Sequence, residues 1–182
     1  MDSAADGPAA LDPSQDPAYE LLGLLGEELA SGDVDNRLVA AVGEAPAQLV
    51  IPLVAENGEV AVVNLCFLPE HDLPPVLQYI VALEYDVAPD AVDNTARFLH
   101  LVNSSLPLTG FELGESVSAV LFRYLQPVSI QPLVTEVVVW PLSMIFHAVT
   151  RFGPLIGQAC DGASMEDLVS GYGQAMAELY RS

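Results

Sequence analysis

The sequence contains no lysine, and its five arginines face 25 acidic residues in a chain of 182. Nucleic acids and anionic membranes are held mainly by Lys and Arg side chains that neutralise phosphate. The formal net charge of −20 therefore predicts that neither is a partner. The charge favours attraction to basic proteins, but it can equally serve to keep a chain of 52% hydrophobic content in solution.

Cysteines and long apolar runs are scarce as well. Cys66 and Cys160 are too few for a disulfide framework, and we expect both to be small buried hydrophobic residues. Residues 1–17 lack the basic and apolar regions of a signal peptide. The longest uncharged apolar run, residues 137–149, is too short to cross a bilayer. We therefore expect a cytoplasmic protein.

Residues suited to catalysis or metal binding are few. His71, His100 and His147 share no ligand spacing. Glu70 and Asp72 flank His71, but a solvated loop explains this cluster better than a metal site. We expect His100 to be half-buried on a helix and His147 to be hydrogen-bonded in the core. No phosphate-binding glycine loop and no nucleophile elbow occurs, and a chain without lysine forms no Schiff base. We therefore predict no enzymatic activity, no cofactor and no metal.

Local signals in the first half of the chain predict helix followed by strands. Asp16-Pro17 is typical of a helix start, and Asn57-Gly58 is typical of a tight hairpin turn. Pro52 lacks an N–H group, which indicates that its strand lies at a sheet edge. The expected elements are a helix over 17–31, one or two helical turns within 33–43, hairpin strands over 49–55 and 59–68, and a strand over 76–87.

Residues 94–126 read as the end of a helix followed by two antiparallel strands. Apolar residues recur every three or four positions through 90–103, which predicts a helix there. The strands should cover 111–113 and 116–126. An antiparallel strand with one solvated face alternates apolar and polar residues, but the second of these strands is apolar on both faces. One face should therefore meet helices, and the other should meet either a second chain or a terminal helix.

Residues 133–159 carry two competing patterns. Their apolar spacing favours a long helix broken near Pro154, whereas the β-branched run at 136–140 is typical of a strand. Ser164 and Asp167 have the spacing of a helix cap and predict a last helix to about residue 180. The whole pattern is that of an α+β fold, with a mainly antiparallel sheet of five to six strands packed against helices. We expect a disordered acidic tail over 1–15, one domain over 16–162, and an added helix over 163–182.

The stretch FLHLVNSSLPLTGFELGESVSAVLFRYLQP resembles the YbjN-type branch of the type III secretion chaperone-like (Tir chaperone-like) family. In that family a helix ends in an Asn-containing segment, and a short strand with an aromatic residue follows, here Phe111. A longer strand then ends in a hydrophobic–Arg–Tyr sequence, here Phe122-Arg123-Tyr124. The order of elements over about 17–162 is also similar. The resemblance implies a sheet packed on helices, a homodimer, and apolar grooves that hold a partner segment in extended form.

These patterns together predict a non-enzymatic, chaperone-like module that holds a segment of a partner protein as a homodimer. An edge strand can receive an added strand, and the two-faced strand can meet a second chain. The alternative function is a small-molecule-binding regulator of the YbjN type, with a pocket between the sheet and the helix at 133–159. The residues that we expect at the partner or dimer surface are Leu49, Ile51, Leu53, Val120, Phe122 and Tyr124.

Overall fold

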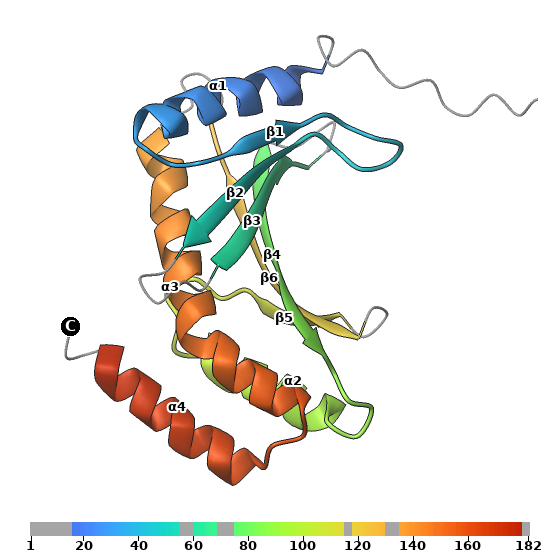
Figure 1. Cartoon of the computed structure of the whole chain (residues 1–182), viewed down its shortest axis with the longest axis vertical. Helices are drawn as coiled ribbons and strands as arrows, with labels where there is room; N and C mark the ends of the chain where they lie inside the picture. Colours follow the sequence, from blue (N-terminus) through green and yellow to red (C-terminus); the bar gives the residue numbers. More distant parts are fainter. Residues whose placement is uncertain (1–15, 55–59, 69–74, 115–117, 130–134, 180–182) are drawn as a thin grey trace, which may run out of the picture. The chain divides into compact units, whose positions relative to one another are not determined.

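The computed structural model of the chain describes residues 16–54, 60–68, 75–114, 118–129 and 135–179. These ranges form an α+β fold with one six-stranded sheet in the order β1-β2-β3-β4-β6-β5 (Figure 1). The predicted fold class is confirmed. The elements are α1 (Pro17–Ser31), β1 (Arg37–Val39), β2 (Gln48–Val54), β3 (Val60–Phe67), β4 (Val76–Asp86), α2 (Val92–Asn103), β5 (Phe111–Gly114), β6 (Ala119–Pro127), α3 (Thr135–Cys160) and α4 (Met165–Leu179).

The strands pair in antiparallel fashion. β1 pairs with β2, with Arg37 opposite Val50 and Val39 opposite Gln48. β5 pairs with β6, with Phe111 opposite Phe122. The Val87 N–H donates to the Ser118 carbonyl at 3.1 Å, and the Val128 N–H donates to the Pro75 carbonyl at 2.9 Å. β6 therefore begins beside the end of β4 and ends beside its start, which is the antiparallel arrangement expected from the sequence.

The chain divides into two compact units that share the long strands. The first unit comprises residues 1–51, 64–78 and 125–135, and the second comprises 52–63, 79–124 and 136–182. β2, β3, β4 and β6 each contribute residues to both units. Local patterns do not reveal this division, because its boundaries fall inside strands that those patterns define as continuous. The predicted tail over 1–15 and the Asn57-Gly58 turn lie outside the described residues.

In the first unit, α1 packs closely on β2. Asp16 accepts a hydrogen bond from the Ala18 N–H at 2.9 Å, so the helix begins where the sequence predicts. A Cβ atom at Gly26 would lie 2.7 Å from Asn36 Oδ1 and 3.0 Å from Leu49 Cδ1. Only glycine permits this approach without a shift of its neighbours. The Asn36 side chain also donates to the Gly26 carbonyl at 2.9 Å, which ties the chain after α1 back to the helix.

Two predictions for the segment around β1 are wrong. Residues 33–43 form no helical turns: Arg37–Val39 is a strand, because it pairs with Gln48–Val50 of β2. β2 is consequently not an edge strand of the sheet. Pro52 is nevertheless compatible with this position, because the β1 pairing ends at Val50 and no β1 residue faces Pro52. The missing N–H of Pro52 therefore costs no hydrogen bond to β1.

In the second unit, α3 is one helix that passes through two prolines. It runs from Thr135 to Cys160 with Pro141 and Pro154 inside it, so it is neither a strand at 136–140 nor broken near Pro154. Figure 1 shows that α3 bends instead of ending. A proline removes one helical hydrogen bond and pushes the preceding turn aside, which bends a helix that packing holds together. The burial of Ile145, Phe152 and Ile156 supplies that packing.

The end of α2 is fastened to β5 by one side chain. The Asn103 side chain donates to the Phe111 carbonyl at 2.8 Å and accepts from the N–H groups of Phe111 at 3.0 Å and Gly110 at 3.3 Å. Phe111 then meets Phe122 of β6 edge to face, with ring centroids 4.9 Å apart. The block of helix, Asn-containing turn and two strands is thus one packed unit.

The predicted C-terminal helix is present as α4. Its first turn is capped by Ser164, whose Oγ accepts from the Asp167 N–H at 3.2 Å. Leu168 is fully buried, and the ring of Tyr172 stacks on Phe152 of α3 with centroids 5.9 Å apart. α4 therefore packs on the rest of the second unit through the side of the helix that carries Leu168 and Tyr172.

Candidate functional site

The part of the sheet in the second unit has one buried face and one exposed face, although both are apolar. Ala61, Val63, Val81 and Leu83 are buried, at 0 to 7% exposed. The residues between them point the other way, because successive strand side chains alternate. Val60 and Val62 on β3 are 59% and 43% exposed, and Val54 on β2 is 65% exposed.

The helix α3 covers the buried face. The Tyr79 hydroxyl lies 3.5 Å from the Val138 carbonyl of α3, and its ring lies 5.8 Å from that of Tyr124 on β6. Burial raises the pKa of the Tyr79 hydroxyl, and Tyr124 raises it further. Tyr79 and Tyr124 share this face with Val120 and Phe122, which are 0% exposed.

This burial corrects the predicted position of the partner surface. Leu49, Ile51, Val120 and Phe122 are all 0% exposed, so they are core residues of their own chain. Leu53 and Tyr124 are half-buried. Alternation along the strands predicted correctly which of these residues share a face. Alternation could not show which of the two apolar faces a helix of the same chain would cover. On β4 and β6, α3 covers the face that we had predicted to meet a partner.

The exposed face carries a cluster that we call the open apolar surface. Its members are aliphatic, are exposed or half-buried, and come from four neighbouring strands. Charges lie at its margin: Glu84 is exposed, and Arg123 pairs with Glu112 of β5 at 2.9 Å. In the second unit, the described residues leave these aliphatic side chains exposed or half-buried. The open apolar surface consists of Val54, Val60, Val62, Ile80, Ala82 and Leu121.

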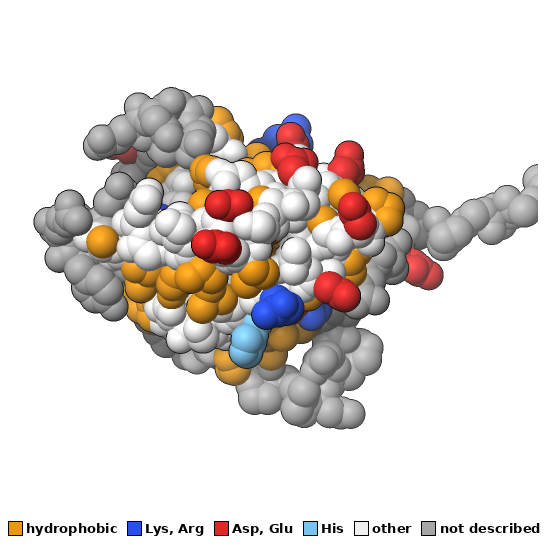
Figure 2. All heavy atoms as spheres, turned by 90° about the horizontal axis from the view of Figure 1, so that it is seen from below, with side chains coloured by type: hydrophobic (Ala, Val, Ile, Leu, Met, Phe, Trp, Pro, Cys, Tyr) orange, Lys and Arg blue, Asp and Glu red, His pale blue; other side chains and the backbone are white. Residues whose placement is uncertain are grey.

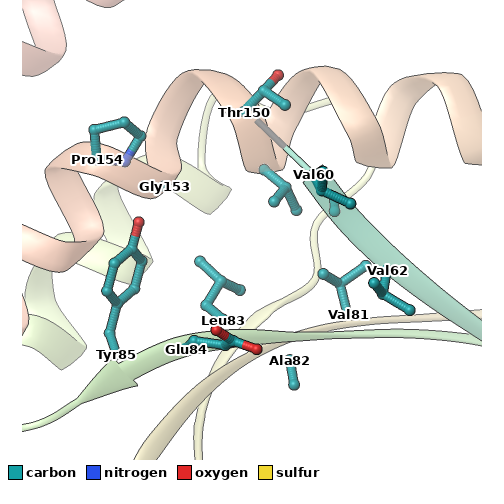
Figure 3. A pocket seen from close by; sticks show the side chains of 12 residues that line it. Val60, Val62, Val81, Ala82, Leu83, Glu84, Tyr85, Thr150, Gly153 and Pro154 are labelled. Carbon is teal, nitrogen blue, oxygen red and sulfur yellow. The ribbon is translucent and has the colours of Figure 1, made fainter. Parts of the chain in front are cut away.

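At this surface, β3, β4 and α3 line a cleft of about 410 Å³, and Val60, Val62 and Ala82 belong to both the surface and the cleft (Figure 3). Most of its wall is aliphatic, and Figure 3 shows Tyr85 reaching from β4 toward α3 near Gly153. A Cβ atom at Gly157 would lie 2.9 Å from the Tyr85 ring, whereas one at Gly153 would meet the Tyr85 hydroxyl only at 3.5 Å. Gly157 therefore seats the Tyr85 ring, and Gly153 keeps the cleft open above it.

A second hollow of about 480 Å³ lies between α2 and α4. Its wall contains Leu101, Met165 and Val169, with Arg97 and His100 beside them. Figure 2 shows such an arrangement on the face it draws, with a basic side chain and a histidine next to hydrophobic side chains. His100 is exposed, whereas the sequence led us to expect a half-buried histidine.

The described residues contain no group of three or more His, Cys, Asp or Glu side chains able to hold a metal ion. His147 is exposed on α3, so its predicted place in the core is wrong, and His71 lies outside the described ranges. Cys66 and Cys160 are buried as predicted. Burial raises the pKa of both thiols, which leaves little reactive thiolate near pH 7.

None of the described helices is long and apolar enough to cross a membrane. The chain matches no protein-family model, no curated protein and no solved structure to which it was compared. The likeness to the YbjN-type family therefore stays a prediction from sequence pattern, and the function has to be argued from the geometry.

Proposed function

We propose that the protein is a non-enzymatic, chaperone-like protein-binding module that acts as a homodimer, with a second copy of the chain seated on the open apolar surface. The observation that supports this proposal is the exposure of Val54, Val60 and Val62 on one uncovered sheet face. Contiguous apolar patches of this kind commonly mark protein interaction sites. A twofold axis brings the same patch of both copies together, so an apolar surface can be its own complement.

Electrostatics favours this surface as the place where two copies meet. Each chain has a formal net charge of −20, so two copies repel wherever acidic side chains face each other. The open apolar surface contains no acidic residue among its six members. Salt screens charges over about 8 Å at physiological ionic strength. We therefore expect added salt to strengthen the association of two copies.

The size of a stable interface sets what else must take part. Specific interfaces bury about 800 Å² on each partner, which is more than six aliphatic side chains supply. The proposed interface therefore extends to the margin, where Arg123 and Glu112 form an exposed ion pair. The resemblance adds that the dimer holds an extended segment of a partner protein. The acidic chain favours a segment with basic residues beside its apolar ones.

The test is the association state of charged variants, measured by analytical ultracentrifugation over a range of protein concentration and salt. Val62→Glu puts one carboxylate on the open apolar surface of each copy. Val62→Lys puts one cation of similar size at the same position. We expect the wild type to be a dimer and both variants to be monomers, because either charge would be desolvated in the interface. Val42→Glu is the control, since Val42 is 73% exposed and lies outside the open apolar surface.

A wild-type monomer at all concentrations would overturn the proposal. So would a dimer that survives both Val62 changes as well as it survives Val42→Glu. The alternative function, a small-molecule-binding regulator, is favoured by a separate observation, the cleft between β3, β4 and α3.

A further inference from the structure

We propose that the cleft between β3, β4 and α3 binds a small, mostly apolar molecule that carries a protonated amine. All the residues that line the cleft belong to one chain. Val60, Val62 and Ala82 are shared with the open apolar surface, so a second copy seated there would cover part of the cleft. This proposal develops the alternative function, because it states the chemistry of the ligand that such a regulator would recognise.

The size and walls of the cleft suit a small apolar ligand. Its volume of about 410 Å³ lies in the lower part of the range of roughly 300–1,000 Å³ that is usual for ligand sites. Aliphatic side chains from three elements form most of the wall, among them Val81 and Leu83 of β4 and Val149 of α3. The Tyr85 ring is fixed by its contact with Gly157, so one wall is formed before any ligand arrives.

Two of the polar side chains at the cleft, those of Glu84 and Thr150, present hydrogen-bond acceptors, and the Tyr85 hydroxyl can accept as well as donate. Glu84 contributes a carboxylate, which accepts hydrogen bonds when ionised and donates none. The Thr150 hydroxyl already donates its hydrogen to the Phe146 carbonyl at 2.8 Å, so it can offer only lone pairs to a ligand. A ligand that satisfies these groups must bring donors of its own, and an ammonium group brings three.

The charge of the site selects the same class. The described residues that line the cleft include the carboxylate of Glu84 and no arginine or histidine. An anionic ligand would meet this carboxylate and the field of a chain with net charge −20. A cation is attracted by both, and the field of the whole chain raises its local concentration at an acidic cleft.

The experiment compares three probes that share an indole ring and differ in charge: tryptamine, tryptophol and indole-3-acetate. Their affinities for the full chain are measured by isothermal titration calorimetry at pH 7 and low salt. We expect tryptamine to bind roughly fivefold more tightly than tryptophol, the ratio typical of one exposed ion pair. Indole-3-acetate should bind most weakly. Absence of binding by all three probes, or equal affinities, would overturn the proposal.

Charge variants assign the preference to one residue. Glu84→Gln should reduce the affinity for tryptamine to that for tryptophol, because it removes the carboxylate and keeps the shape of the side chain. Glu166→Gln is the matched control, since Glu166 is an exposed carboxylate on α4 and does not line the cleft. Equal losses in the two variants would show a general effect of net charge and would overturn the assignment to Glu84.

Filling the cleft tests its position. Gly153→Leu places a side chain where Gly153 leaves space beside Tyr85, and should abolish binding of all three probes. Val149→Phe fills the opposite part of the α3 wall and serves if Gly153→Leu unfolds, which circular dichroism would reveal. Undiminished binding in folded Gly153→Leu or Val149→Phe would overturn the site. A wild-type monomer that binds tryptamine in this way would refute the homodimer and leave the ligand site intact.

Discussion

The two faces of the sheet in the second unit differ in what covers them far more than in composition. On one face, Tyr79 and Val81 are at most 2% exposed, and the Tyr79 hydroxyl lies 3.5 Å from the Val138 carbonyl of α3. On the other face, Val60 and Val62 of β3 stay about half exposed. Valine, leucine and isoleucine supply both faces. An apolar strand face therefore indicates that something covers it, while the covering body can be a helix of the same chain or another molecule.

The comparison also separates stability from association. Side chains under α3 contribute to folding, because removing them leaves a cavity in packed surroundings. Side chains of the open apolar surface contribute to folding much less, because they already contact water in one chain. If a second copy covers that surface, their contribution appears in the association constant.

The largest effect is expected for Phe122→Ala, on the covered face. Phe122 is 0% exposed and meets Phe111 edge to face, so truncation should lower the free energy of unfolding by about 3–5 kcal/mol. Leu121→Ala, one residue earlier and on the open face, should cost only about 1 kcal/mol. Urea denaturation of both variants at low protein concentration measures the difference. Equal losses would contradict the assignment of the two faces.

The next effect distinguishes two glycines of α3 that face Tyr85. Gly157→Ala should destabilise by about 1–3 kcal/mol, because its methyl group would lie 2.9 Å from the Tyr85 ring. Gly153→Ala makes the same chemical change four residues earlier, at an ordinary 3.5 Å contact. It should change stability by no more than about 1 kcal/mol, because the helix propensity of alanine is offset by the contact of its Cβ atom with the ring of the following Pro154. Thermal unfolding of the two variants compares the two changes in stability, and an equal loss in both would contradict the close contact between Gly157 and the Tyr85 ring.

A pH titration of stability tests the burial of Tyr79. Because burial raises the pKa of Tyr79 in the folded chain, the unfolded chain ionises first, near pH 10. The stability linked to this group is fully present below pH 10 and is lost as the pH rises toward the folded pKa. Tyr79→Phe should make the alkaline loss less steep by about 1.4 kcal/mol per pH unit. The difference in stability between the wild type and Tyr79→Phe is first measured at pH 7. If this difference stays the same above pH 10, the predicted ionisation of buried Tyr79 is contradicted.

The smallest effect is expected for Val62→Thr, which adds a hydroxyl that water can reach. The stability of the single chain should change by no more than about 0.5 kcal/mol. Val63→Thr is the matched change on the next residue, and Val63 is 0% exposed. Its hydroxyl would be buried without a prepared partner, at a cost of about 1–3 kcal/mol. Urea midpoints that shift equally for both variants would show that β3 has no open face.

Local signals predicted the elements that local chemistry decides. Asp16-Pro17 predicted the start of α1, and Ser164 predicted the start of α4. The apolar spacing within 90–103 predicted α2. The same reasoning failed at β1, because a three-residue strand is stable only through its pairing with β2. The same reasoning wrongly predicted a break in α3 near Pro154. It considered the free-energy cost of a proline inside a helix and could not include the tertiary packing that offsets this cost.

The candidate site was less predictable than the elements. Its cleft joins residues of β3, β4 and α3 that lie up to about 90 positions apart, and no local pattern connects them. A pocket between the sheet and the helix at 133–159 was one expectation. The roles of Gly153 and Gly157 became visible only once Tyr85 lay opposite them. Lining residues of this kind carry no motif, because aliphatic side chains look the same in a wall and in a core.

By itself the sequence determined the α+β fold class, the alternation of side chains along the strands and the strongly negative net charge. Propensity, spacing and charge depend only on the residues and their order in the chain. Tertiary structure alone decided that α3 covers the face of Val120 and Phe122, that β1 caps part of β2, and that Val54, Val60 and Val62 face outward. The physical reason is that a strand apolar on both sides gains nearly the same free energy whichever face is buried first. The choice belongs to the helix that packs on it.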